Sequence, residues 1–206
     1  MREEPQRIDG RLEGTLRVPD VEPRAIVVVA HALPTHGGTM RNPLIATIAR
    51  ACAERGCLAL RFNFRGVEGS AGVWTNGRDE PSDVAAAVAH ARSLAPGLPL
   101  GVSGYSFGAL VTLRWLEQGG HPDAVALAGV PLRSVSLAQE GLPPVPDGTF
   151  IVAAEDDQFG TASELRARYP AARIHEIKGV DHFFPGRHRE VGAAIADELA
   201  RRLRID

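Results

Sequence analysis

The sequence predicts an α/β fold, in which a mostly parallel sheet carries helices on both of its faces. Short β-branched runs such as residues 25–30 (AIVVVA) are typical of strands buried on both faces, and they alternate with longer segments of helical periodicity. Strands that alternate with helices require right-handed crossovers, which favour parallel pairing. With 206 residues, of which 44% are hydrophobic, the chain is long enough to bury one core without metals or disulfides.

The elements are expected in a regular order along the first half of the chain. Residues 6–18 are predicted to form an edge strand or a hairpin, because Leu12 and Leu16 stand among polar neighbours. The elements that follow are a strand over 25–30, a helix over 43–55, a strand over 57–64, a helix over 82–94 and a strand over 98–103.

The same alternation continues in the second half. A helix is expected from about residue 109, and Gly119-Gly120 is expected to end it. The elements after it are a strand over 124–130, a strand over 150–154, a helix over 162–168, a strand over 173–177 and a helix from about 187 to 203. No repeat, low-complexity tract or linker divides the chain, so we expect a single domain over residues 1–206.

Composition and charge argue against several classes of function. A formal net charge of −2 gives no electrostatic reason to expect nucleic acid or a membrane surface as a partner. No apolar run is long enough to span a membrane, and the polar segment 1–9 resembles no signal sequence, so we expect a cytoplasmic protein. We expect it to be a monomer or a homodimer. Cys52 and Cys57 lack the spacing of a zinc site, so we expect buried, inert thiols and no metal or organic cofactor.

The pentapeptide Gly104-Tyr105-Ser106-Phe107-Gly108 carries the strongest functional signal. It lies between an expected buried strand and an expected helix, which is the context of a nucleophile elbow. Such a sharp turn holds the serine in a cramped backbone conformation, and its neighbours must lack a Cβ. The turn exposes the serine Oγ, so we predict that Ser106 is a nucleophile.

A nucleophilic serine needs an adjacent base, and that base needs an acid to orient it. The acid is expected in the loop 155–160 (EDDQFG), which directly follows the strand over 150–154. We choose Asp157 over Asp156 because of its distance from the strand end. A turn or helix N-cap role is the alternative reading of both residues.

The base is expected in the loop that follows the last strand, residues 179–184 (GVDHFF). His182 lies in this loop, and the order Ser…Asp…His is the one expected for this architecture. The competing histidines are His175, inside the expected strand, and His188, at the start of the last helix. We expect His175 to pack or face solvent and His188 to lie on the surface, so His182 is our candidate base.

An oxyanion hole requires two backbone N–H donors beside the nucleophile. Phe107, directly after the serine, is expected to supply one of them. The second is expected from the loop 31–38 (HALPTHGG), where Leu33 is our first choice and Ala32 our second, since Pro34 has no N–H. The chain contains neither G-x-x-x-x-G-K-[ST] nor G-x-G-x-x-G after its first long strand, which argues against nucleotide binding.

Taken together, five motifs follow one another in order: HALPTHGGTMRN, FNFRGVEGSAG, GYSFG, EDDQFG and VDHFF. In this combination the chain resembles the α/β-hydrolase superfamily from about residue 11 to residue 190. More narrowly, it resembles the small lidless bacterial serine hydrolases and esterases related to dienelactone hydrolases. The resemblance implies Ser106, Asp157 and His182 as nucleophile, acid and base.

The chain departs from the family pattern at several positions. In the first motif, Ala32 and Leu33 replace the residues that are common in the family. In the second motif, Glu68 replaces a glycine. The resemblance implies that Arg65 shapes its loop and is not catalytic. Dienelactone hydrolases proper use a cysteine nucleophile, and the serine of this chain argues against their chemistry.

The resemblance and the residues together predict hydrolysis of small carboxylic esters through an acyl-enzyme. The segment 131–149 is too short for a substantial helical lid, so an open site is expected. Trp74, Phe159 and Phe183 are candidate walls of the substrate pocket or, alternatively, core residues. The alternative functions are a perhydrolase, acyltransferase or thioesterase with the same three residues, and a ligand-binding protein without catalysis.

Overall fold

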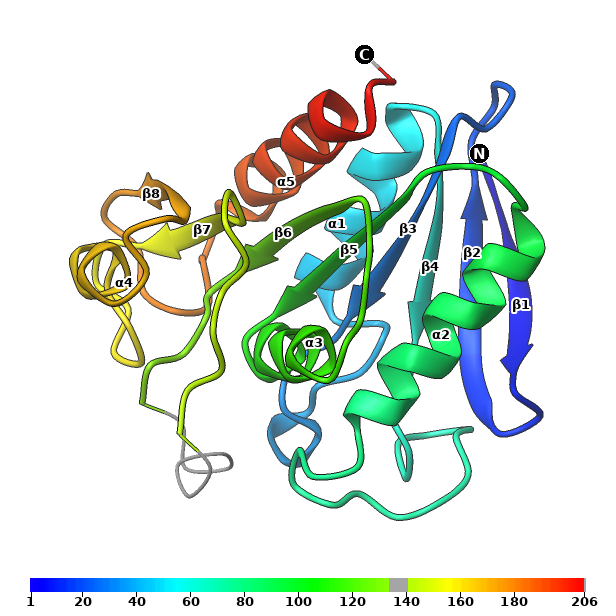
Figure 1. Cartoon of the computed structure of the whole chain (residues 1–206), viewed down its shortest axis with the longest axis horizontal. Coiled ribbons are helices and arrows are strands. Elements are labelled where there is room, and N and C mark those ends of the chain that lie inside the picture. Colours follow the sequence, from blue (N-terminus) through cyan, green and yellow to red (C-terminus); the bar gives the residue numbers. More distant parts are fainter. Residues whose placement is uncertain (134–140, 206) are drawn as a thin grey trace.

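Strands at the centre of the molecule form one sheet in the computed structural model, which describes residues 1–133 and 141–205 (Figure 1). Within these residues the sheet has eight strands in the order β1-β2-β4-β3-β5-β6-β7-β8. The strands are β1 (Arg2–Ile8), β2 (Leu12–Val18), β3 (Ala25–Ala30), β4 (Cys57–Phe62), β5 (Leu100–Tyr105), β6 (Ala124–Ala128), β7 (Phe150–Ala154) and β8 (Arg173–Ile177). From β4 to β8 all neighbours are parallel, and the hairpin of β1 and β2 joins β4 antiparallel.

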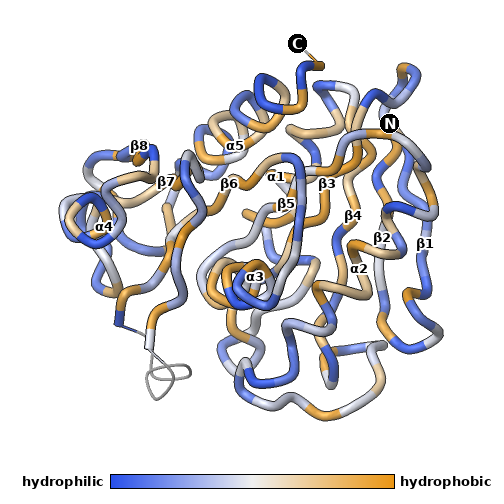
Figure 2. The backbone as a smooth tube through the Cα atoms, in the orientation of Figure 1, coloured by the Kyte–Doolittle hydropathy of each residue, from blue (hydrophilic) through white to orange (hydrophobic). Residues whose placement is uncertain are grey.

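Helices cover both faces of this sheet, as expected from the buried strands. The helices are α1 (Pro43–Glu54), α2 (Pro81–Leu94), α3 (Phe107–Glu117), α4 (Ala162–Arg168) and α5 (His188–Leu203). One core forms where α1 and α5 pack on the sheet, and a second forms under α2, α3 and α4. Figure 2 shows hydrophobic residues concentrated along the central strands. The predicted α/β fold class is therefore confirmed.

Several strand boundaries differ from those expected. β1 begins at Arg2, because the polar residues that open the chain pair across the hairpin with β2 as far as Val18. β5 runs on to Tyr105, since it pairs with β6 up to Ala128 and leads directly into the elbow. β6 ends before Gly129, whose φ of 52° takes the backbone out of the extended region.

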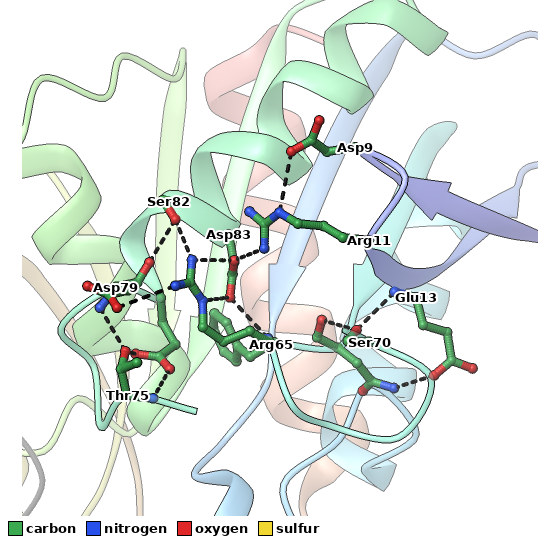
Figure 3. Close-up of polar contacts among 12 residues, drawn as sticks. Asp9, Arg11, Glu13, Arg65, Ser70, Thr75, Asp79, Ser82 and Asp83 are labelled. Atoms are coloured by element: carbon green, nitrogen blue, oxygen red, sulfur yellow. Dashed lines mark hydrogen bonds and ion pairs between the residues drawn. The ribbon is translucent and has the colours of Figure 1, made fainter. Parts of the chain in front are cut away.

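The loop between β4 and α2, residues 63–80, is fixed by buried carboxylates (Figure 3). Asp83 is fully buried at the start of α2 and accepts hydrogen bonds from the backbone N–H and guanidinium of Arg65 and from Arg11 of the hairpin turn. Glu80 is also fully buried, and it accepts from the backbone N–H groups of Thr75 and Gly77. Arg65 thus holds its loop to α2, and this loop forms one side of the site described next.

Candidate active site

The turn between β5 and α3 has the strained geometry of a nucleophile elbow. Ser106 has φ 55° and ψ −117°, a conformation that residues with a side chain rarely adopt. A Cβ on Gly104 would lie 2.6 Å from the carbonyl oxygen of Gly108, and a Cβ on Gly108 would lie 2.4 Å from that of Ala30. Both glycines are therefore required for α3 to pack this closely against the sheet.

The structure brings the three expected side chains into one hydrogen-bonded line. The Oγ of Ser106 lies 2.8 Å from Nε2 of His182, and Nδ1 of His182 lies 2.8 Å from Oδ2 of Asp157. His182 is 3% exposed and Asp157 is 1% exposed, so both side chains are shielded from water. With Asp157 accepting from Nδ1–H, Nε2 is left to accept a proton from the serine hydroxyl.

The loop after β7 distinguishes the two neighbouring aspartates. Asp157 points into the protein, where its second carboxylate oxygen accepts the backbone N–H of Phe159 at 2.8 Å. Asp156 is exposed, and its backbone N–H donates to the carbonyl oxygen of Val180. Neither aspartate caps α4, because Thr161 is the N-cap and forms a capping box with Glu164. The alternative N-cap role is therefore excluded, while the turn role holds for Asp157.

The two competing histidines lie away from Ser106. His175 is part of β8, with its ring 6.1 Å from that of Phe150. His188 begins α5, and its Nε2 lies 3.0 Å from the carbonyl oxygen of Phe183. Neither ring has a hydrogen bond to Ser106 among the residues that the structure describes, so His182 is the histidine placed to act on this serine.

Two backbone N–H groups are available beside the serine. Those of Phe107 and Leu33 donate to no other group within residues 1–133 and 141–205, and both residues line the cavity above Ser106. The carbonyl oxygen of Leu33 accepts the N–H groups of His36 and Gly38, which closes a short 3₁₀ turn over Pro34–His36. This turn leaves the Leu33 N–H free for a ligand oxygen.

A buried histidine supports this loop, and sequence reasoning did not single it out. His31 is fully buried, with Nδ1 2.7 Å from the carbonyl oxygen of Ala32 and Nε2 3.2 Å from the backbone nitrogen of Phe64. Burial lowers the pKa of His31 from 6.5 to about 4, so the ring is neutral at pH 7. A neutral ring can donate through Nδ1 and accept through Nε2, and it thereby links the loop after β3 to the loop after β4. Only its position directly after a buried strand could have indicated this role.

A cavity of about 510 Å³ opens above Ser106. Most of its lining is apolar, and it includes two of the three expected walls, Phe159 and Phe183. Trp74 does not line this cavity; its ring lies 6.4 Å from that of Phe107, and its indole N–H has no partner among the described residues. Besides Tyr105, Ser106 and His182, the polar lining residues are Thr35, His36, Asn42, Asn76 and Arg133.

Residues 1–133 and 141–205 contain neither a candidate metal centre nor a candidate membrane-spanning helix. No group of three or more His, Cys, Asp or Glu side chains gathers there in a way that could hold a metal ion. No helix in that part of the chain combines the length and the apolar character needed to cross a membrane. Cys52 and Cys57 are free and buried, and burial raises the pKa of the Cys57 thiol to about 11.

The strand order, the elbow and the residues around it are those of an α/β hydrolase. A family described as an alpha/beta hydrolase domain matches residues 23–204, which is most of the chain, so this protein belongs to that family. The resemblance read from the motifs is thereby confirmed.

The chain is also similar to individual proteins and solved structures. An uncharacterized protein from Rickettsia prowazekii is 27% identical over 202 residues, 93% of this chain and 85% of that protein. An α/β serine hydrolase without a lid from Xanthomonas campestris has a TM-score of 0.84 at 24% identity, over 98% of this chain and 95% of its own. An α/β serine hydrolase homologue from Coxiella burnetii also has a TM-score of 0.84, at 25% identity and over 97% of each chain.

Proposed function

We propose that this α/β hydrolase is a serine carboxylesterase that cleaves small esters through an acyl-enzyme. The observation that carries the proposal is the unbroken line from Ser106 Oγ through the His182 ring to Asp157, with 2.8 Å at each link. A serine held in this way is activated when the imidazole removes its proton. The strained φ of Ser106 presents Oγ to the cavity, where a carbonyl carbon can approach it.

The reaction proceeds in two acyl transfers. As Oγ of Ser106 attacks the ester carbonyl, His182 takes the serine proton and then returns it to the leaving alcohol. Water then attacks the acyl carbon while His182 removes a proton from it. The bond between the acyl carbon and Oγ breaks, His182 gives this proton to Oγ, and the carboxylic acid leaves. Asp157 holds the tautomer of His182 and stabilises its imidazolium form throughout.

The N–H groups of Phe107 and Leu33 receive the charge that develops on the carbonyl oxygen. Both are backbone groups that line the cavity, one from the first residue of α3 and the other from the loop after β3, so no side chain has to move to form the oxyanion hole. Donors of this kind contribute about 10²–10³ in rate.

The cavity favours small esters with an apolar acyl or alcohol group. Phe159 and Phe183 flank the imidazole at ring distances of 4.7 and 5.7 Å, which leaves an apolar entrance beside the nucleophile. Phe183 is 60% exposed, as expected for a residue at the rim of an open site.

A fluorophosphonate probe and a series of aryl esters test the proposal directly. The wild type is expected to be labelled and to hydrolyse short aryl esters, whereas Ser106→Ala is expected to lose both properties. Ser103→Ala is a matched control, because Ser103 is buried in the same strand and its hydroxyl has no partner among the described residues. A wild type that is neither labelled nor active on any ester of the series would contradict the proposal and favour a binding protein.

A further inference from the structure

Tyr105, the residue directly before the nucleophile, contacts His182 in two ways. It is 4% exposed, and its ring stacks on the imidazole with centroids 5.4 Å apart and an angle of 28° between the planes. Its hydroxyl donates a hydrogen bond to the backbone carbonyl oxygen of His182 at 3.0 Å. One side chain thus holds both the ring and the main chain of the proposed base.

Gly129 shows how tightly this pair is packed. A Cβ at this position would lie 3.1 Å from Cε2 of Tyr105 and 3.2 Å from Cε1 of His182. Phe159 stands edge-on against the imidazole at 4.7 Å. The ring of His182 is therefore enclosed between β6, the loop after β7 and the phenol of Tyr105, with little room to rotate.

The Tyr105 hydroxyl is a permanent donor in this position. Burial, followed by the charges of Asp157 and Asp181, raises the pKa of Tyr105 well above its usual value. The hydroxyl consequently keeps its proton at neutral pH and can donate to the His182 carbonyl oxygen.

We infer that Tyr105 is a positioning residue that keeps His182 aligned with both Ser106 and Asp157. This inference rests on the proposed function. The loop that bears His182 is joined to the sheet near the site through this hydroxyl, and the imidazole must move a proton twice without leaving the line between Oγ and the carboxylate. Small displacements of a catalytic group carry large rate penalties, so an anchor at the backbone of the base acts on turnover more than on substrate binding.

The test compares Tyr105→Phe with a matched variant, Tyr169→Phe. Tyr169 is also buried, at 5% exposure, and its hydroxyl also donates to a backbone carbonyl oxygen, that of Pro143 at 3.2 Å. Both substitutions remove one buried hydroxyl and retain the ring, so they are expected to lower stability to a similar degree. Only Tyr105→Phe is expected to lower kcat, by roughly tenfold with KM unchanged. Tyr105→Leu, which also removes the stacked ring, is expected to lower kcat by about 10².

A second readout is independent of turnover. The proton between Nδ1 of His182 and Asp157 gives a downfield resonance, which is expected to broaden in Tyr105→Phe and to stay sharp in Tyr169→Phe. Equal kcat in the wild type and both variants, together with an unchanged resonance, would overturn the inference. A wild type that resists the fluorophosphonate would overturn the proposed function alone, and the resonance would still decide the role of Tyr105.

Discussion

At the scale of single residues, the geometry of the site depends on glycines, which lack a side chain, as well as on the polar side chains around Ser106. Gly108, in the first turn of α3, lies so close to the end of β3 that a Cβ would overlap the backbone of Ala30 and His31. The same close approach places the Phe107 N–H beside the loop after β3, where the second expected donor lies. The spacing of the elbow motif predicts this from sequence, because only glycine fits where helix and strand meet so closely.

The buried histidine of the loop after β3 gives a pH-dependent prediction. His31 has a pKa of about 4 in the folded protein and 6.5 in a free side chain, so between these values the unfolded chain binds more protons than the native one. The free energy of unfolding is therefore expected to fall as the pH decreases from about 6.5 to 4, by about 3 kcal/mol from this residue alone. Urea denaturation at several pH values measures it.

The control for this experiment is His31→Gln, whose side chain does not titrate. Its overall stability is expected to be lower, but its slope against pH is expected to be flatter than that of the wild type in this range. The carboxylates elsewhere in the chain contribute equally to both proteins and cancel in the comparison. Parallel slopes would contradict a neutral, buried His31.

Residue positions near the site could be predicted from sequence to different extents. Ser106 and His182 follow from motif order, and Asp157 follows from its distance past the strand, since parallel strands bring their carboxyl ends to one edge. Whether Trp74 lines the pocket or packs in the core could not be decided from sequence. Its place depends on the path of the loop 63–80, which is set by bonds to residues distant in sequence, such as that from Arg11 to Asp83.

At the scale of elements, the loop 63–80 is a fixed structure and not a loose connection. It joins the hairpin of β1 and β2 to α2, and Arg7 and Arg11 of the hairpin contact it through Gly69 and Ala71. Its first residues also reach the site, because the N–H of Phe64 donates to His31. The hairpin, although far from Ser106 in the sheet, therefore supports the loop after β3 indirectly.

The buried carboxylate of α2 is expected to stabilise this loop strongly. Removing it in Asp83→Ala leaves the guanidinium groups of Arg11 and Arg65 without their shared partner, and their side chains are only 31% and 16% exposed. The expected loss of unfolding free energy is about 3 kcal/mol, and trypsin is expected to cleave the loop faster. Chemical denaturation and timed proteolysis measure the two effects.

The matched control removes a carboxylate that lies on the surface. Glu54 pairs with Arg50 one turn earlier on α1, with side chains 44% and 63% exposed, so Glu54→Ala is expected to change stability by no more than ~0.5 kcal/mol. A loss in Asp83→Ala as small as that in Glu54→Ala would show that the network does not hold the loop.

Strand boundaries were predicted to different extents. β3, β7 and β8 match their expected ranges, whereas β5 and β6 do not, although they are buried along their whole length. The start of β1 could not be predicted, since an edge strand is mostly polar and its extent is fixed by pairing with β2 rather than by its own sequence.

At the scale of the whole molecule, the residues of the candidate site come from loops on both sides of the central strand β5. The strands on one side of β5 carry the loops after β3 and β4, which contain the second proposed oxyanion donor and the histidine that supports its loop. The strands on the other side carry the loops with Asp157 and His182. Ser106 stands at the end of the strand between them, so the site exists only when both halves of the sheet are assembled.

An open cavity predicts simple kinetics with poorly soluble esters. The segment 131–149 is too short to form a substantial helical lid, and Phe183 is exposed at the rim of the cavity. The initial rate is therefore expected to rise hyperbolically with ester concentration and to show no jump at the solubility limit. A sharp increase in rate as substrate droplets form would indicate a closing element instead.

The left-handed backbone of Ser106 has a practical consequence for measuring the folded population. In an unfolded chain nothing stabilises a serine at φ 55°. Nothing there holds its hydroxyl against an imidazole that lies 76 residues further along the chain. If Ser106 is the nucleophile proposed here, the stoichiometry of its covalent labelling counts native molecules, and each destabilised variant reports its own native fraction in a crude extract. Labelling of the strained serine would then measure the fraction of molecules that are folded.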